Sequence, residues 1–153
     1  MKTMIAAAAL GLLCATEASA RTNWQGEAVV TAVNAACTAE AENVGAIYKV
    51  MFYPSGITDN GADSYMTFHG YRNVFSARIA AGRPGTGKAY SVAYVNSYGK
   101  NSAQPSGKFN TYTQSPAALT TTTPFVTATM QMTNWGAIVG CTATLEAAFV
   151  RRR

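Results

Sequence analysis

The pattern that decides the fold lies near the end of the chain, in residues 123–150, which read TPFVTATMQMTNWGAIVGCTATLEAAFV. Apolar residues alternate there with polar or smaller ones, first as Val126, Ala128, Met130 and Met132. After a turn at Asn134-Trp135-Gly136 the alternation resumes with Val139, Cys141, Ala143, Leu145, Ala147 and Phe149. Strict alternation over segments of this length predicts a half-buried antiparallel hairpin. A register that pairs Met132 with Val139 places Cys141 opposite Met130, on the inner face.

Comparable segments fill the rest of the chain. Strands are predicted at residues 24–33, 45–53, 64–70, 73–80, 89–98 and 108–112, separated by turns rich in Gly, Pro and Asn, and no segment has a convincing helical period. Short strands between such turns are typical of sandwiches and small barrels. The sequence therefore predicts an all-β domain, an antiparallel two-sheet sandwich of about seven or eight strands, with a small β-barrel as the alternative.

The register of the hairpin at residues 64–80 can be argued from its apolar residues. If Tyr71-Arg72 form the turn, Phe68 faces Phe75 and Met66 faces Ala77, so that all core side chains share one face. A slip of one residue would turn one apolar set toward solvent. The opposite face then carries Tyr65 across from Arg78, with His69 beside the turn.

The start of the chain has the features of a secretory signal. Lys2 is followed by an apolar run rich in Ala and Leu, and Ala18-Ser19-Ala20 supplies the small residues of a cleavage site. We expect cleavage after Ala20, so that residues 1–20 are a signal peptide and residues 21–153 a single all-β domain. A membrane anchor is disfavoured because the run is short and Thr16 and Glu17 interrupt it. No later apolar run approaches membrane-spanning length. The protein is expected to be secreted or periplasmic in a bacterium.

The cysteines fit an exported protein. Cys14 is lost with the signal, which leaves Cys37 and Cys141. Two cysteines in an oxidising compartment most simply form one disulfide. A two-cysteine metal site lacks two further ligands at usable spacing, and we expect no metal and no cofactor. The predicted Cys37–Cys141 bridge brings the end of the first strand against the last.

Charge is sparse and positive. The chain has a net charge of +5, and 12% of its residues are charged. Lys and Arg are scattered along the sequence except for Arg151-Arg152-Arg153, whereas a nucleic-acid binder usually clusters them. We expect no nucleic-acid partner. The terminal triplet is either a solvated tail or a weak electrostatic contact with an acidic surface or polymer.

Residues 82–88, GRPGTGK, fit the phosphate-loop spacing G-x-x-x-x-G-K. That motif also needs a Ser or Thr next in the chain to hold Mg²⁺, and a helix whose N-terminus faces the phosphates. Ala89 and a predicted strand follow here instead. A Gly-rich connection between two strands explains the segment better than nucleotide binding does.

Catalytic residues are not indicated. His69 is the only histidine, and it could join Asp59 or Asp63 and a serine in a hydrolase triad. The sequence has no Gly-x-Ser-x-Gly elbow, however, and no spacing among its few acids marks a glycosidase pair. A polar histidine on a strand surface is the simpler interpretation.

Tyrosine is a more prominent candidate for binding than the single histidine, because the chain has eight tyrosines. Tyr90, Tyr94 and Tyr98 share one face of a predicted strand, while Tyr65 and Tyr71 fall on the outer face of their hairpin with Arg78. Aromatic and Arg side chains on a sheet surface suit sugar rings or a protein partner, although tyrosine also favours half-buried sheet positions. We take Tyr65, His69, Tyr71 and Arg78 as candidate ligand-binding residues.

One segment resembles a known family. Residues 26–37, a strand that ends in Ala-Ala-Cys just after an export signal, are similar to the opening of a chaperone–usher pilin subunit. That resemblance implies assembly by donor-strand exchange. Pilins place their second cysteine much nearer the first and end in an aromatic-rich strand, whereas here Cys141 is distant and three arginines end the chain.

These patterns lead to an ordered set of functional expectations. The first is a non-catalytic envelope or secreted protein that binds a protein or polysaccharide partner at the cell surface, through a sheet face or loops. The second is a structural, pilin-like subunit that assembles by strand exchange. The third is a small secreted hydrolase.

Overall fold

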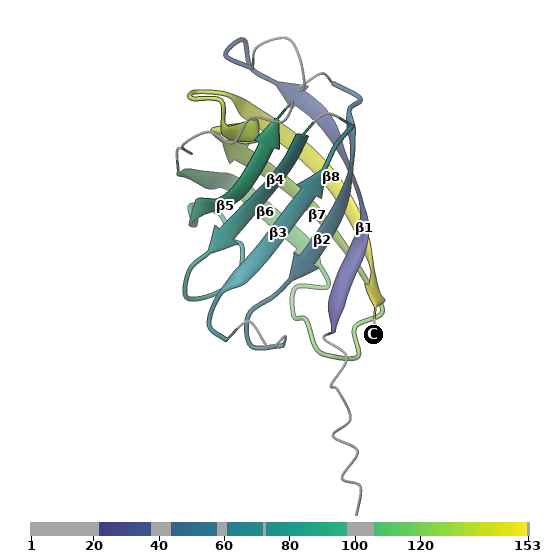
Figure 1. Ribbon diagram of the computed structural model, residues 1–153. Helices are drawn as coiled ribbons and strands as arrows, with labels where there is room; N and C mark the ends of the chain where they lie inside the picture. The colour runs from purple at the N-terminus through teal and green to yellow at the C-terminus, as the bar shows by residue number, and fades with distance from the viewer. Residues whose placement is uncertain (1–21, 38–43, 58–60, 72, 98–105, 153) are drawn as a thin grey trace, which may run out of the picture.

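The computed structural model describes residues 22–37, 44–57, 61–71, 73–97 and 106–152. Eight antiparallel strands form one sheet that closes on itself (Figure 1). They are β1 (Asn23–Val33), β2 (Ile47–Tyr53), β3 (Ser64–His69), β4 (Asn73–Ile79), β5 (Ala89–Ser97), β6 (Gly107–Ser115), β7 (Phe125–Thr133) and β8 (Thr142–Arg152). The all-β prediction is confirmed. The sandwich is not confirmed, because the strands form the barrel named as the alternative.

Pairing between the first and last strands makes the sheet a closed barrel rather than a sandwich. β1 pairs with β8 from Asn23–Arg152 to Val33–Ala143, and every other strand pairs with its sequence neighbours. A sandwich and a barrel both need one apolar face per strand, so alternation alone does not distinguish them. Closure also removes the exposed edges that a sandwich leaves.

One glycine marks how closely β1 and β8 approach. A Cβ atom built on Gly26 would lie 1.8 Å from the carbonyl oxygen of Ala148. No L-side chain fits at that distance, so glycine is required where the two strands meet.

The inner face of the barrel is filled by apolar side chains. Tyr48, Phe52, Phe68, Phe75, Phe109 and Phe149 are each at most 2% exposed, and methionines and small aliphatic residues fill the space between them. The outer face carries mainly Thr, Gln, Glu, Lys and Arg, with Ile47, Phe125 and Val150 as large exposed apolar residues on the strands. The predicted hairpin of residues 64–80 is confirmed in register: Phe68 pairs with Phe75, Met66 with Ala77 and Tyr65 with Arg78.

The predicted register of the last hairpin is wrong. Met132 pairs with Ala143 rather than Val139, and Met130 pairs with Leu145 rather than Cys141. The connection is longer than a tight turn because it contains a 3-10 turn, Trp135–Ala137, flanked by Asn134 in the left-handed region. That turn places Trp135 inside the upper end of the barrel, fully buried, while Val139 is 77% exposed.

The predicted disulfide is confirmed. Cys37 follows β1 and Cys141 precedes β8, and their Cα atoms lie 4.5 Å apart. A disulfide indicates an environment outside the reducing cytoplasm. Among the described residues, no helix is long and apolar enough to cross a membrane.

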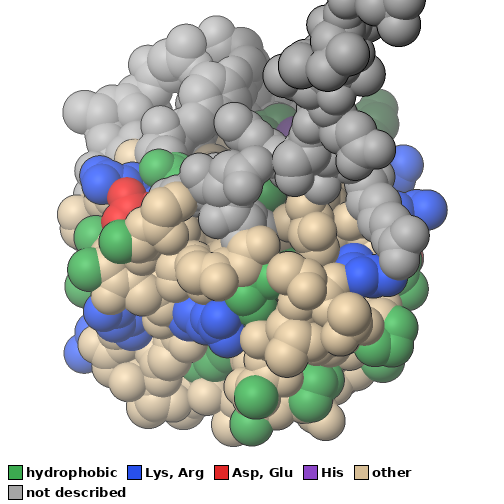
Figure 2. Space-filling model, turned by 90° about the horizontal axis from the view of Figure 1, so that it is seen from below, with side chains coloured by type: hydrophobic (Ala, Val, Ile, Leu, Met, Phe, Trp, Pro, Cys, Tyr) green, Lys and Arg blue, Asp and Glu red, His purple; other side chains and the backbone are tan. Residues whose placement is uncertain are grey.

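The barrel has two unlike ends. The upper end in Figure 1 holds the disulfide and Trp135. The lower end holds the β2–β3, β4–β5 and β6–β7 connections, together with the start of β1 and the end of β8. Figure 2 views this lower end and shows Lys and Arg side chains spread around it, with little acidic surface.

Candidate functional site

The outer face of β2, β3 and β4 carries a row of aromatic and Arg side chains. Tyr53 pairs with Tyr65 across β2 and β3, and Tyr65 pairs with Arg78 across β3 and β4. We call Tyr53, Tyr65 and Arg78 the aromatic row. The two tyrosines are partly exposed, and 47% of the Arg78 side chain is exposed. The prediction that Phe75 points inward and this face outward is confirmed, since Phe75 is fully buried.

An acidic residue fixes the arginine of the aromatic row. Arg78 Nε donates to Asp63 Oδ2 at 2.7 Å, and Nη2 lies 2.7 Å from the same oxygen. The Ala81 N–H donates to Asp63 Oδ1 at 3.0 Å. The Ala81 and Arg78 donors, in that order, lower the pKa of Asp63, and the same carboxylate raises the pKa of Arg78. Arg78 is therefore held in place at the end of the row.

This arrangement predicts a pH-dependent contribution of Asp63 to stability. The pKa of Asp63 is lower in the folded than in the unfolded chain, so its stabilisation is present above about pH 3.8 and is lost as the pH falls through the lower folded value. We expect Asp63→Asn to melt at a lower temperature than the natural chain at neutral pH and at the same temperature in strong acid. Thermal melts at several pH values measure this. A difference that stays constant across the whole pH range would contradict it, and Arg78→Gln provides the matched removal of the other partner.

A second row of side chains crosses the same outer wall. His69 pairs with Lys49 across β3 and β2, and Lys49 pairs with Glu27 across β2 and β1. We call His69, Lys49 and Glu27 the charged row. A hollow of about 570 Å³ lies over it, lined by Gln25, Gly26, Glu27, Lys49, Val50, Met51, His69, Val150 and Arg152. Ligand pockets of proteins commonly have volumes in this range.

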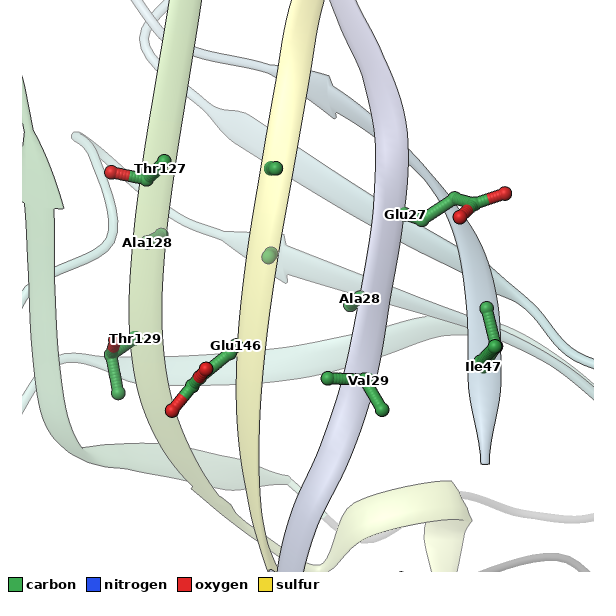
Figure 3. Close-up of a pocket in the computed structure, with 10 residues that line it drawn as sticks. Glu27, Ala28, Val29, Ile47, Thr127, Ala128, Thr129 and Glu146 are labelled. Carbon is green, nitrogen blue, oxygen red and sulfur yellow. The ribbon is translucent and has the colours of Figure 1, made fainter. Parts of the chain in front are cut away.

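A smaller hollow of about 400 Å³ adjoins the first at Glu27. It lies over β2, β1, β8 and β7, with Thr127, Thr129 and Glu146 on its far side (Figure 3). Glu27 and Glu146 point in opposite directions there, away from each other. Two carboxylates in a glycosidase must flank a shared bond, and this pair does not converge. We call the two hollows together the side groove.

His69 is placed differently from what a triad requires. Its Nε2 atom is buried and has no hydrogen-bond partner among the described residues. A general base needs a hydrogen bond to its nucleophile and a second one to an orienting acid. The hypothesis of a small hydrolase gains no support from this geometry. His69 contributes instead to the lining of the hollow over the charged row.

The four predicted ligand-binding residues do not form one site. Tyr65 and Arg78 are neighbours in the aromatic row, and His69 lies in the charged row. Tyr71 lies in the β3–β4 connection at the upper end, 97% exposed, beyond the opposite end of β3 from Tyr65. Sequence reasoning missed Tyr53, although alternation in residues 47–53 puts it on the same outer face as Lys49.

Two other candidate features have structural explanations. Residues 82–88 connect β4 to β5, and their end extends the wall: the Gly87 N–H donates to Phe109 O at 2.7 Å, and the Phe109 N–H donates to Lys88 O at 3.0 Å. A strand follows, so no helix N-terminus faces a phosphate. Tyr90 is 2% exposed and belongs to the core, where burial raises the pKa of its phenol. The Tyr94 side chain and Tyr98 lie outside the described residues.

Neither a cluster of metal ligands among the described residues nor a similar protein identifies the site. Over the part of the chain that the structure describes, no group of three or more His, Cys, Asp and Glu side chains could hold a metal ion. No family model, curated protein or solved structure matches the chain.

Proposed function

We propose that the chain is an exported, non-catalytic envelope or secreted protein that binds a polysaccharide along the outer wall of β1 to β4. The observation that carries this proposal is the cross-strand pair Tyr53–Tyr65 beside the side groove. Met51 lines the groove, and the Tyr53 hydroxyl donates to its Sδ at 3.8 Å. The aromatic row therefore borders the hollow that the charged row lines.

The chemistry of the two rows supports a sugar polymer. Partly exposed tyrosine rings offer apolar faces on which sugar rings stack. Arg78 adds an arginine, a residue type that often contributes strongly to binding energy at interfaces. Gln25, Glu27, Lys49 and His69 offer the donors and acceptors that sugar hydroxyls need. Tyrosine and arginine side chains are also common in interfaces with folded proteins, so the test below distinguishes the two kinds of partner.

Packing inside the barrel also favours the outer wall as the place where a ligand binds. Trp24, Phe52, Phe68, Phe75 and Phe109 are fully buried within it. Small eight-stranded barrels either fill their interior with side chains or hold a ligand there. These large residues occupy the interior, so a ligand within the barrel has no support.

Titration of the mature, oxidised protein with fragments of bacterial envelope polysaccharides tests the proposal. We expect NMR shift changes concentrated on β1 to β4, and a roughly five- to tenfold loss of affinity for Tyr53→Ala and for Tyr65→Ala. Tyr71→Ala is the control, because it removes an exposed tyrosine at the other end of β3. An equal loss in Tyr71→Ala, or shifts confined to other strands, would contradict the proposal. Binding of a folded protein with the same footprint would favour a protein partner.

A second candidate, a structural subunit that assembles by strand exchange, has one observation in its favour. Among the described residues, β5 pairs with β6 at Ala89–Lys108 and Tyr90–Gly107, and hydrogen bonds that join Gly87 and Lys88 to Phe109 extend this short ladder. A short ladder is the place where a closed barrel would open most easily to another strand. Size-exclusion chromatography of the mature protein distinguishes the two candidates: oligomers favour strand exchange, and a stable monomer favours the binding protein.

A further inference from the structure

Basic side chains that are scattered in the sequence gather at the lower end of the barrel. Arg83 and Lys88 belong to the β4–β5 connection, and Arg151 and Arg152 end β8. We call these four residues the basic end. Figure 2 shows Lys and Arg side chains spread around this face. The phosphate-loop-like segment and two of the terminal arginines, unrelated in sequence, thus belong to one surface.

Hydrogen bonds to backbone carbonyls hold these side chains without neutralising them. Arg83 Nε donates to Ser55 O at 3.1 Å, and Lys88 Nζ donates to Ala81 O at 3.4 Å. The Arg151 guanidinium donates to Thr121 O. Because each acceptor is an uncharged carbonyl of a lower connection, the positive charge remains available to a partner.

Few acids offset this charge. Asp63 is the acid that the structure describes at this end, and it is already paired with Arg78. The four residues of the basic end therefore contribute a net charge of +4 among the described residues. Glu27 and Glu146 lie on the side wall instead.

The positions of the charges indicate a broad, flat partner. In the closed order of eight strands, β4 and β8 are four places apart, so Arg83 and Arg151 lie on opposite sides of the barrel. A polymer strand would contact one side at a time, whereas a planar array of negative charges meets both. Phe125 and Val150, an exposed apolar pair next to Arg151, would contact the boundary between headgroups and acyl chains.

We propose that the basic end binds electrostatically to a membrane surface that contains anionic phospholipids. The barrel then stands on its lower end, with the aromatic row and the side groove facing sideways. This attachment can be tested separately from the proposed polysaccharide site, because Lys88 and Arg151, whose charges the test removes, neither line the side groove nor belong to the aromatic row.

Co-sedimentation of the mature, oxidised protein with lipid vesicles tests this proposal. We expect binding to phosphatidylcholine vesicles that contain phosphatidylglycerol, no binding to pure phosphatidylcholine, and release by high salt. Lys88→Gln/Arg151→Gln removes one charge from each side of the barrel. Since a basic residue near an anionic surface changes the affinity roughly fivefold, the double variant should bind about 25-fold more weakly.

The matched control is Lys49→Gln, which removes one charge from the side wall and is compared with Arg151→Gln alone, for which we expect a roughly fivefold loss. Lys49 pairs with His69 and Glu27 on the outer wall, away from the lower connections. We expect Lys49→Gln to keep most of the vesicle binding. An equal loss in both single variants, or no binding to anionic vesicles, would overturn the proposal. Binding to a soluble acidic polysaccharide or nucleic acid without vesicle binding would overturn it too, and thermal melts of the variants check that each is folded.

Discussion

Replacing Cys37 and Cys141 by alanine is expected to lower the melting temperature by about 15 °C under oxidising conditions. The bridge joins residues that are 104 positions apart. Closing a loop of this length removes on the order of 4–5 kcal/mol of unfolded-chain entropy in the loop model, which corresponds to a shift of this size for a domain near 130 residues. Calorimetry or circular dichroism of the oxidised protein measures it.

The control is the natural chain melted with a reductant present. Reduction opens the same loop, so the natural chain and the double variant should then melt at nearly the same temperature. Cys37→Ala alone should behave as the double variant does, because either substitution abolishes the bridge. Equal melting of the natural chain with and without reductant would refute a stabilising bridge.

The two hairpins differ in how much of them could be predicted, and the difference is physical. Phe68 and Phe75 flank a short connection, so only one register puts both rings inside, and the structure has that register. In the last hairpin, the rule of alternation gave Val139 an inward position, but the chain buries Trp135 instead. A tryptophan within a connection can be drawn into the core, and periodicity of the strands carries no information about that.

The candidate site was predictable only in part for a similar reason. Tyr65 and Arg78 are neighbours because one hairpin contains them, and alternation fixes which way they face. Tyr53 and Glu27 join the same wall through pairs between strands that lie further apart in the sequence. The basic end is more remote still, since Arg83 and Arg151 share a surface only after the barrel has closed. Alternation within a strand predicts which side chains face outward. The pairing of all eight strands in the closed barrel determines which outward-facing side chains become neighbours.

Trp135→Ala is expected to be among the most destabilising single substitutions in the chain. Trp135 is fully buried, and its ring centroid lies 4.9 Å from that of Phe68, 5.2 Å from Phe75 and 5.3 Å from Tyr48. Truncation of a buried Phe or Trp to alanine costs about 3–5 kcal/mol, because the surrounding side chains collapse only partly into the cavity. Urea denaturation should show a lower midpoint with little change in slope.

Two further variants separate the packing of the ring from effects on the connection itself. Trp135→Phe keeps an aromatic ring against Phe68 and Phe75 and should recover a substantial part of the loss. Val139→Ala alters the same connection at a residue that is 77% exposed and should change stability by less than about 0.5 kcal/mol. If Val139→Ala cost as much as Trp135→Ala, the loss would come from the backbone of the connection. Because three rings from β2, β3 and β4 contact Trp135, whereas Val139 faces solvent, we expect the loss to follow the ring.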